Sequence, residues 1–195
     1  IQGKITSIPN PVTLQAKEEL DKKKRILFVG RLADEKQPFL LLKIWKCLQN
    51  NLLDYQLDIV GDGKLRPDLE QYANKHKIRN IHFYGKQKPV KFYEKAILFF
   101  MTSSYEGMPL TILEAMSFQC VPIVFDSFPT VHDLIDNNQN GLIIPPFDID
   151  EFVTQTINLL KDEERIKQMQ IFCEQKVKQF SLAEIIHKWE TLFIS

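Results

Sequence analysis

The chain has 195 residues, enough to bury a substantial core, and 44% of them are hydrophobic and 26% charged, as in ordinary globular proteins. Its 25 basic and 25 acidic residues give a formal net charge of zero, without the basic excess of a nucleic-acid-binding protein. The three cysteines, Cys47, Cys120 and Cys173, form no metal-binding or disulfide pattern, which favours a reducing, cytoplasmic location. The longest wholly apolar run, 96–101, is too short to span a bilayer.

Residues 1–24 are predicted to be a lead-in that links this chain to a preceding domain. The chain opens at Ile1 without an initiator Met, which favours an excised domain or a fragment. The two prolines within 8–12 favour extended or turning backbone. The basic run 22–25 is predicted to be solvated, since Lys and Arg are mostly exposed in folded proteins.

Short apolar runs alternate with helix-like patterns from residue 25 onward. Runs that suit strands covered on both faces lie at 26–29, 56–60, 81–84, 97–101, 121–125 and 141–144. The alternation predicts an α/β fold, a Rossmann-like parallel sheet of about six strands with helices on both faces, in a domain spanning 25–195. Beyond the prolines at 145 and 146, apolar stripes at 149–160 and 182–193 predict C-terminal helices.

A basic loop follows the first predicted strand. Gly30 ends the strand, and Arg31 and Lys36 come next, at an edge where ligands bind in open α/β sheets. Arg offers a planar fork of donors and Lys a compact charge, which suits phosphate groups. Two solvated surface cations remain an equally good interpretation of these residues alone. Because the turn lacks G-x-G-x-x-G, a dinucleotide oxidoreductase is the weakest enzyme hypothesis.

A second group of polar residues follows the fourth predicted strand. Pro109 is predicted to be the first residue of a helix, whose N-terminus offers N–H groups and a positive dipole end to an anion. Glu106 precedes this helix and Glu114 lies in its second turn, and carboxylates accept hydrogen bonds from vicinal hydroxyls. The alternative is a helix-capping Glu106 and a surface Glu114. Beside two cations, the pair suits a ligand made of sugar, diphosphate and ribose.

The spacing Glu106-x7-Glu114, followed by Ala-Met, resembles the E-x7-E signature of the family 4 retaining glycosyltransferases, which have the GT-B fold. Further blocks follow in the order of that family at 8–12, 27–32 with Lys36, 59–63, 83–85, 121–124 and 140–143. The resemblance extends over nearly the whole chain, roughly 8–193. It implies the C-terminal, donor-binding domain of a two-domain enzyme, with an N-terminal acceptor-binding domain outside this chain.

The resemblance also implies a role for individual residues. As catalytic residues, Arg31 and Lys36 would hold the donor diphosphate and Glu106 would accept hydrogen bonds from the donor sugar. Glu114 would hold the ribose, and the other implied donor-binding residues are Gly107, Met108 and Leu110 beside the sugar and Lys86 and Gln87 near the base. The family needs neither metal nor cofactor. The sequence also departs from the family pattern in its loops: Gln37 stands where the family often has Gly, and the Gly-Gly before its later acid is replaced in 128–133, where Asp133 would stand in for that acid.

The predicted function is therefore a glycosyltransferase domain that binds a nucleotide-diphosphate sugar, with a UDP-sugar favoured. Transfer would retain anomeric configuration and would go to a saccharide or lipid-linked acceptor in cell-surface polysaccharide synthesis. The expected partners are the nucleotide sugar and the N-terminal domain, with no nucleic acid. The full-length protein is expected in the cytoplasm, in peripheral contact with the inner face of the membrane. The alternatives are a GT-B nucleotide-sugar epimerase and a non-catalytic nucleotide-binding domain.

Overall fold

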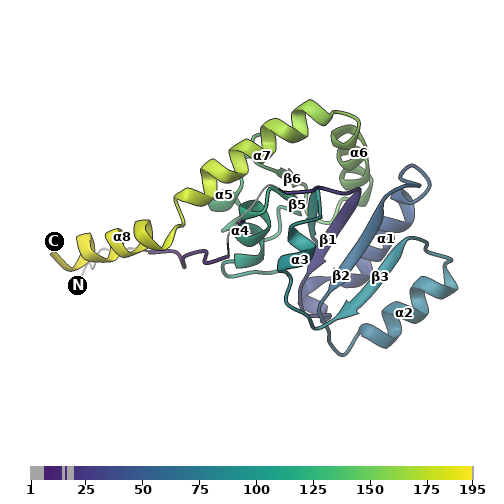
Figure 1. Ribbon diagram of the computed structural model, residues 1–195. Coiled ribbons are helices and arrows are strands. Elements are labelled where there is room, and N and C mark those ends of the chain that lie inside the picture. Colours follow the sequence, from purple (N-terminus) through teal and green to yellow (C-terminus); the bar gives the residue numbers. More distant parts are fainter. Residues whose placement is uncertain (1–6, 15, 17–19, 195) are drawn as a thin grey trace.

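The structure, a computed structural model, describes residues 7–14, 16 and 20–194. A six-stranded sheet lies at its centre, with the strand order β3-β2-β1-β4-β5-β6 and parallel pairing throughout those strands (Figure 1). The strands are β1 (Arg25–Val29), β2 (Gln56–Val60), β3 (Ile81–Gly85), β4 (Leu98–Met101), β5 (Val121–Phe125) and β6 (Leu142–Ile144). All six predicted strands are confirmed to within one residue at each end. This order is that of a Rossmann-like sheet.

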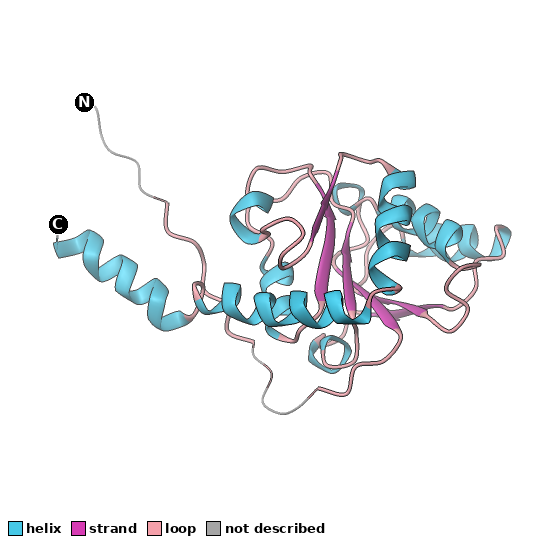
Figure 2. Cartoon of the chain, turned by 90° about the horizontal axis from the view of Figure 1, so that it is seen from above, coloured by secondary structure: helices cyan, strands magenta, loops and turns pink. Residues whose placement is uncertain are grey.

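Helices cover both faces of the sheet, as predicted (Figure 2). They are η1 (Asp34–Lys36, a 3₁₀ turn), α1 (Pro38–Leu48), α2 (Arg66–Lys75), α3 (Val90–Tyr93), α4 (Leu110–Ser117), α5 (Val131–Leu134), α6 (Ile149–Leu160), α7 (Glu163–Lys178) and α8 (Leu182–Ile194). The two predicted C-terminal helices are α6 and α8. None of the helices in the described part of the chain is long and apolar enough to cross a membrane.

Two details of the helices differ from the sequence-based prediction. Pro109 does not begin α4: its backbone is extended, with φ −76° and ψ 94°, and the helix starts one residue later at Leu110. The 16-residue helix α7 lies between the two predicted C-terminal helices and was not predicted. Its buried side chains are separated by long charged and polar ones, so it lacks the strong apolar stripe of its neighbours.

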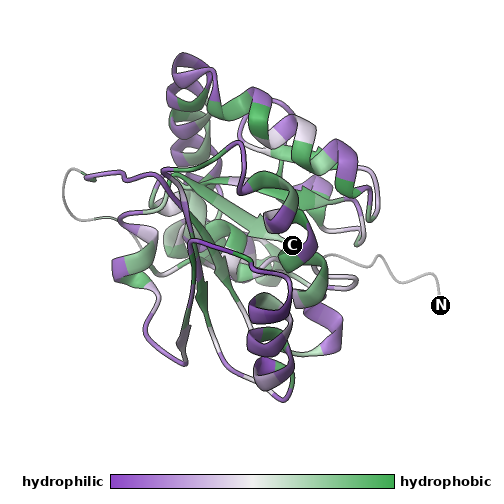
Figure 3. Cartoon of the chain, turned by 90° about the vertical axis from the view of Figure 1, so that its right-hand side faces the viewer, coloured by the Kyte–Doolittle hydropathy of each residue, from purple (hydrophilic) through white to green (hydrophobic). Residues whose placement is uncertain are grey.

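The sheet separates two hydrophobic cores, because successive side chains of a strand point to opposite faces. Ile26 and Phe28 of β1 face a core that includes side chains of α1, α2 and α6. Leu27 faces a second core formed with α3, α4 and α5, and α7 contributes to both. Figure 3 shows the strands as a green, hydrophobic layer between helices whose outer surfaces are largely purple. Burial on both faces explains why the strands read as continuous apolar runs.

The described part of the lead-in packs against the second core. Val12 is buried, and its N–H donates to the carbonyl oxygen of Phe180 at 2.9 Å. The Lys22 ammonium donates to the carbonyl oxygens of Tyr93 and Ala96, at 2.9 and 2.7 Å, and to that of Phe118. The prediction that 22–25 is solvated is therefore wrong for Lys22, whose three donors are all satisfied by carbonyls near the ends of α3 and α4. Residues 1–6, 15 and 17–19 of the lead-in lie outside the described residues.

Helix α8 extends from the end of α7 away from the sheet (Figure 1). Ile185 is buried against the domain, whereas other large apolar side chains of this helix are exposed. Leu182, Ile186, Trp189 and Phe193 are exposed and recur at the spacing of one helix face. The helix therefore presents an apolar strip that no described residue of this domain covers.

Candidate functional site

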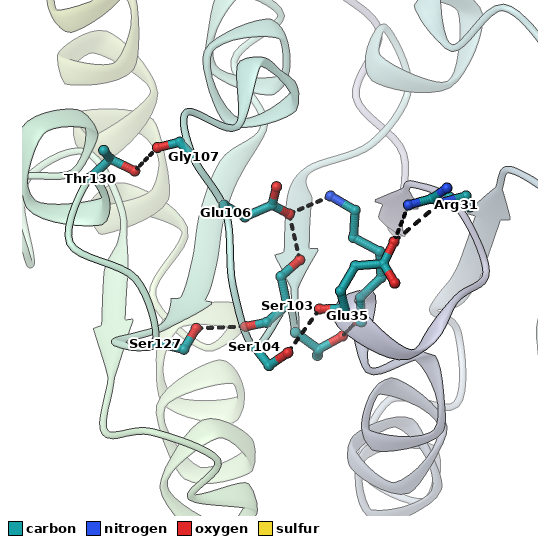
Figure 4. Close-up of polar contacts among 10 residues, drawn as sticks. Arg31, Glu35, Ser103, Ser104, Glu106, Gly107, Ser127 and Thr130 are labelled. Carbon is teal, nitrogen blue, oxygen red and sulfur yellow. Dashed lines mark hydrogen bonds and ion pairs between the residues drawn. The ribbon is translucent and has the colours of Figure 1, made fainter.

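The two motifs singled out in the sequence meet at the point where the winding of the sheet reverses. Strands β1 and β4 are neighbours, with β2 and β3 beyond β1 and with β5 and β6 beyond β4. In open α/β sheets the ligand crevice lies at this switch point, outside the carboxyl ends of the strands. The loop after β1 carries Arg31 and Lys36, and the loop after β4 carries Glu106 (Figure 4). The fold thus brings the predicted catalytic residues to one edge.

The loop after β1 is shaped by close contact with the loop after β2. Gly61 has a φ of 143°, and a Cβ added there would lie 1.9 Å from the carbonyl oxygen of Gly30. A Cβ on Gly63 would lie 2.4 Å from the carbonyl oxygen of Leu32. The Leu32 N–H also donates to the carbonyl oxygen of Asp62 at 3.0 Å. Only glycine at these two positions lets the β2 loop support the β1 loop so closely.

The loop after β4 holds the other side of the same segment. The buried Thr102 hydroxyl donates to the carbonyl oxygens of Lys36 and Gln37, at 2.9 and 3.3 Å. The Ser104 N–H donates to the carbonyl oxygen of Glu35 at 2.8 Å. Gln37, which stands where the resembled family often has Gly, adopts the left-handed backbone conformation with φ 49° and ψ 48°. The loop geometry that glycine would permit is therefore present with Gln in its place.

Lys36 and Glu106 form an ion pair across the switch point (Figure 4). They are 70 positions apart in the sequence, and their side chains are only 21% and 13% exposed. The Ser103 hydroxyl donates to the same Glu106 oxygen, Oε1, at 2.7 Å. The described partners of this carboxylate are thus a cation and a hydroxyl, which hold it beside the β1 loop.

Arg31 makes a different kind of pair. Its Nε donates to Glu35 Oε1 at 3.1 Å within the same loop, and the two side chains are 72% and 38% exposed. A hydrogen bond from the backbone, followed by the Arg31 guanidinium, lowers the pKa of Glu35. Glu35 therefore stays ionised at neutral pH and remains a counter-charge for Arg31. The guanidinium nevertheless faces solvent, where an incoming anion can reach it.

The N-terminus of α4 lies directly after Glu106. Gly107 is exposed, and a Cβ added there would meet nothing within 4 Å, so the backbone is open to an incoming group. Its carbonyl oxygen accepts from the Thr130 hydroxyl at 2.7 Å. Met108 is half-buried, with its Sδ 3.3 Å from the backbone nitrogen of Asn10, and Leu110 begins the helix. The first amides of a helix have no acceptor within the helix and attract anions. In α4 the Ile112 N–H already donates to the carbonyl oxygen of Pro109 at 3.1 Å, whereas the turn before it begins with the exposed Gly107.

Glu114 lies in the second turn of α4, as predicted, and it is half-buried rather than a surface residue. Its Oε2 accepts a hydrogen bond of 3.0 Å from the hydroxyl of Tyr93, on α3. Lys86 and Gln87 are exposed in the loop after β3, and Gln87 Nε2 donates to the carbonyl oxygen of Tyr84 at 3.0 Å. The donor-binding roles of these three residues stay predictions.

Sequence reasoning missed several polar residues that build the site. Thr102 and Tyr93 were not singled out, and Ser103, which begins the segment containing Glu106, was given no role, although Thr102 and Ser103 directly follow a predicted strand, where functional side chains gather. The loop after β5 joins the site as well, because the Ser127 hydroxyl donates to the carbonyl oxygen of Ser103 at 2.6 Å. Asp133, the proposed replacement for a family acid, is exposed near this loop. Among the described residues, no three His, Cys, Asp or Glu side chains are grouped so that they could hold a metal ion.

The strand order and the position of the site define a Rossmann-like α/β domain whose ligand edge is lined by cations, carboxylates and a helix N-terminus. Comparison with known proteins makes this class more specific. The model of the family described as "Glycosyl transferases group 1" matches residues 12–175. The chain therefore belongs to the group 1 glycosyltransferase family, and its sheet is that of a GT-B enzyme domain.

Individual relatives agree with this assignment. An uncharacterized glycosyltransferase of Haemophilus influenzae is 32% identical over 95% of this chain and 54% of its own length. A Campylobacter jejuni α-1,4-N-acetyl-D-galactosaminyltransferase, named for an acceptor on PP-undecaprenol, is 32% identical over 87% of this chain and 47% of its own length. The solved pneumococcal O-GlcNAc transferase GtfA, in complex with UDP and GlcNAc, superimposes with a TM-score of 0.86 at 26% identity, covering 98% of this chain and 40% of that one. The chain thus spans about half the length of the curated relatives it matches.

Proposed function

We propose that this chain is the donor-binding half of a retaining glycosyltransferase and that its donor is a nucleoside-diphosphate sugar, with a UDP-sugar favoured. One observation carries the proposal: Arg31, Lys36, Glu106 and the N-terminus of α4 converge at the switch point of the sheet. Two cations and a helix N-terminus suit a diphosphate, and a carboxylate between them suits sugar hydroxyls.

The same groups account for catalysis of sugar transfer without a metal. Negative charge develops on the diphosphate as the anomeric bond breaks, and fixed positive groups stabilise that charge. Arg31 and Lys36 supply two of these groups, and the first turn of α4 supplies amide donors. Retention follows if the acceptor attacks from the leaving-group side and the departing phosphate takes the acceptor proton. No protein nucleophile is then required from this domain.

The remaining predicted residues bind the other parts of the donor in this proposal. Glu114 accepts hydrogen bonds from the ribose, and Glu106 accepts them from the donor sugar. The turn from Gly107 to Leu110, which includes Met108 and in which Gly107 is exposed, faces the sugar. Lys86 and Gln87 lie on the loop after β3, the strand beside β2, and they contact the base. Each part of the ligand is thus assigned to one loop at the carboxyl edge.

The named relatives support the choice of donor and acceptor. GtfA binds UDP and GlcNAc in its solved structure, which supports a UDP-sugar here. The Campylobacter relative is named for a saccharide acceptor on PP-undecaprenol, which supports a saccharide or lipid-linked acceptor in cell-surface polysaccharide synthesis. Such an acceptor would bring the full-length protein into peripheral contact with the inner, cytoplasmic face of the membrane.

A second domain that holds the acceptor completes the proposed enzyme. The matched relatives are about twice as long as this chain, which supports such a domain. The exposed apolar strip of α8, formed by Leu182, Ile186, Trp189 and Phe193, offers it a contact surface. Since positioning of two reactants accounts for about 7–11 kcal/mol of barrier, this chain alone should transfer no sugar. Detectable transfer by the 195-residue chain would contradict the two-domain proposal.

A thermal-shift screen tests the donor class. UDP-, GDP- and ADP-sugars are compared with NAD at equal concentrations, because a ligand that binds only the folded state raises the melting temperature of the protein. We expect at least one sugar nucleotide to stabilise the chain and NAD to have no effect. Stabilisation by NAD alone would contradict the proposal. Incubation of the full-length protein with the stabilising donor then separates transfer from epimerisation and from binding without reaction.

A further inference from the structure

Tyr93 is a completely buried tyrosine whose hydroxyl meets the proposed ribose-binding carboxylate. Its hydroxyl donates to Glu114 Oε2 at 3.0 Å, and the residue is 0% exposed. Its ring stacks on that of Phe118, with centroids 5.7 Å apart and an interplanar angle of 15°. The ring therefore cannot turn freely, and its hydroxyl is held at a fixed point beside α4.

The backbone of Tyr93 is held from the other side. Its carbonyl oxygen accepts from the Lys22 ammonium at 2.9 Å and from the Cys120 thiol at 3.1 Å. Lys22 also donates to the carbonyl oxygen of Phe118, so one half-buried lysine joins the end of α3 to the end of α4. These contacts hold the ends of the two helices together, and the Tyr93–Glu114 hydrogen bond also joins α3 to α4.

The Tyr93 hydroxyl keeps its proton and is a stable hydrogen-bond donor to Glu114. Burial, assisted by the nearby charge of Glu114, raises the pKa of Tyr93 well above its ordinary value. The phenol therefore stays protonated at neutral pH, and it donates to the carboxylate. Without such a partner, a half-buried glutamate side chain can adopt more than one rotamer, and fixing it on binding would reduce affinity.

We propose that Tyr93 is a positioning residue for nucleotide binding, which holds Oε2 of Glu114 toward α3 and leaves Oε1 for a ribose hydroxyl. The proposal rests on the proposed function, in which Glu114 binds the ribose. Tyr93 also lies on the short helix that follows the loop of Lys86 and Gln87. The segment proposed to meet the base is therefore tied directly to the carboxylate that meets the ribose.

Paired calorimetric titrations of the 195-residue chain test this role. Wild type, Tyr93→Phe, Glu114→Gln and the double variant are titrated with UDP and with 2′-deoxy-UDP, or with the matched pair of GDP or ADP if the screen selects another base. We expect wild type to prefer UDP about tenfold, and Tyr93→Phe to reduce that preference about threefold while 2′-deoxy-UDP affinity is unchanged. The double variant should be no weaker than Glu114→Gln, because Tyr93 acts through that carboxylate.

Tyr84→Phe provides the matched control. This half-buried tyrosine packs beside α3, and its hydroxyl contacts Gln56 at 3.2 Å and not Glu114. Its removal should leave the preference for UDP over 2′-deoxy-UDP unchanged. If Tyr93→Phe does not fold, Phe118→Leu loosens the stacked ring while keeping the hydroxyl, and we expect it to lower the same preference.

The outcomes separate this inference from the proposed function. If Tyr93→Phe loses affinity for both nucleotides equally, Tyr93 has only a structural role. If the preference for UDP over 2′-deoxy-UDP is unchanged, Tyr93 has no role in ribose binding. Either result overturns the inference. So does an unchanged preference in Phe118→Leu, if that variant is needed. If wild type binds UDP and 2′-deoxy-UDP equally and Glu114→Gln changes neither, the assignment of Glu114 to the ribose fails, and the inference fails with it.

Discussion

The two cation–carboxylate pairs at the carboxyl edge of the sheet differ in almost every physical respect. Lys36 and Glu106 come from loops 70 positions apart, and their side chains are 21% and 13% exposed. Arg31 and Glu35 belong to one loop and are 72% and 38% exposed. The first pair is also held by the hydroxyl of Ser103, whereas the second faces solvent.

The difference shows how one site can combine a fixed cation with a mobile one. An exposed ion pair contributes about 0–1 kcal/mol, so Arg31 can leave Glu35 for a ligand at little cost. A half-buried charge needs a partner, because water no longer solvates it fully. Lys36 should therefore remain in place and exchange Glu106 for the diphosphate, which also releases the carboxylate for the sugar. The following predictions test this contrast, beginning with the largest expected effect.

Replacement of Lys36 by Met should have the largest effect on donor binding. The change removes the proposed charged hydrogen bond to the diphosphate, and such a bond contributes about 1.5–3 kcal/mol, so UDP affinity should fall about 10- to 100-fold by calorimetry. Lys64→Met is the matched control, since Lys64 is exposed and pairs with Asp34 at 2.5 Å. A similar loss in both variants would show that general positive charge, and not the position of Lys36, attracts the nucleotide.

Replacement of Glu106 by Gln should separate binding from reaction. Free UDP affinity should stay within about threefold, because the carboxylate is not proposed to contact the nucleotide and no longer competes for Lys36. In the full-length enzyme we expect the transfer rate to fall about tenfold, more than donor affinity, since contacts that strengthen in the transition state act on rate. Loss of free UDP binding with unchanged transfer would reverse this assignment.

Replacement of Arg31 by Ala should weaken UDP binding about three- to tenfold and leave the melting temperature almost unchanged. The side chain is mostly exposed, and its loss removes no core packing. Calorimetry and thermal denaturation of the same preparation distinguish the two effects. A marked fall in melting temperature with normal UDP affinity would make Arg31 structural.

Replacement of Glu35 by Gln should have the smallest effect on UDP affinity, and it should raise that affinity rather than lower it. The guanidinium of Arg31 loses its local counter-charge, so UDP should bind up to about threefold more tightly at low salt, with the gain reduced at high salt. Titrations at two ionic strengths measure this change. Weaker binding in this variant would mean that Glu35 orients Arg31 rather than competing for it.

The sequence predicted the sheet well because its strands, apart from the half-buried edge strand β3, are largely buried and read as apolar runs. The sequence also predicted that Arg31, Lys36 and Glu106 lie at one edge of the sheet, because the carboxyl ends of parallel strands lie together. It could not predict the Lys36–Glu106 pair, which depends on how two distant loops pack. The contacts of Lys22 were missed for a related reason: its carbonyl partners lie in or just after two helices far along the chain.

Backbone details were also beyond the sequence. Gln37 adopts a left-handed conformation that its residue type does not favour, because Thr102 holds its carbonyl oxygen and that of Lys36. The start of α4 was placed one residue early because Pro109 suits the first helical position in general. Tyr93 was missed because its neighbours in the sequence carry no recognisable motif, and only the fold places its hydroxyl on Glu114.

The most direct test of the central claim is a calorimetric comparison of UDP with UMP on this chain, or of the matching pair for the base that the screen selects. The site is proposed to recognise a diphosphate through Lys36, Arg31 and the first turn of α4. UDP should therefore bind at least about tenfold more tightly than UMP, since each charged hydrogen bond to the second phosphate contributes about 1.5–3 kcal/mol. Equal affinity for the two nucleotides would contradict the account.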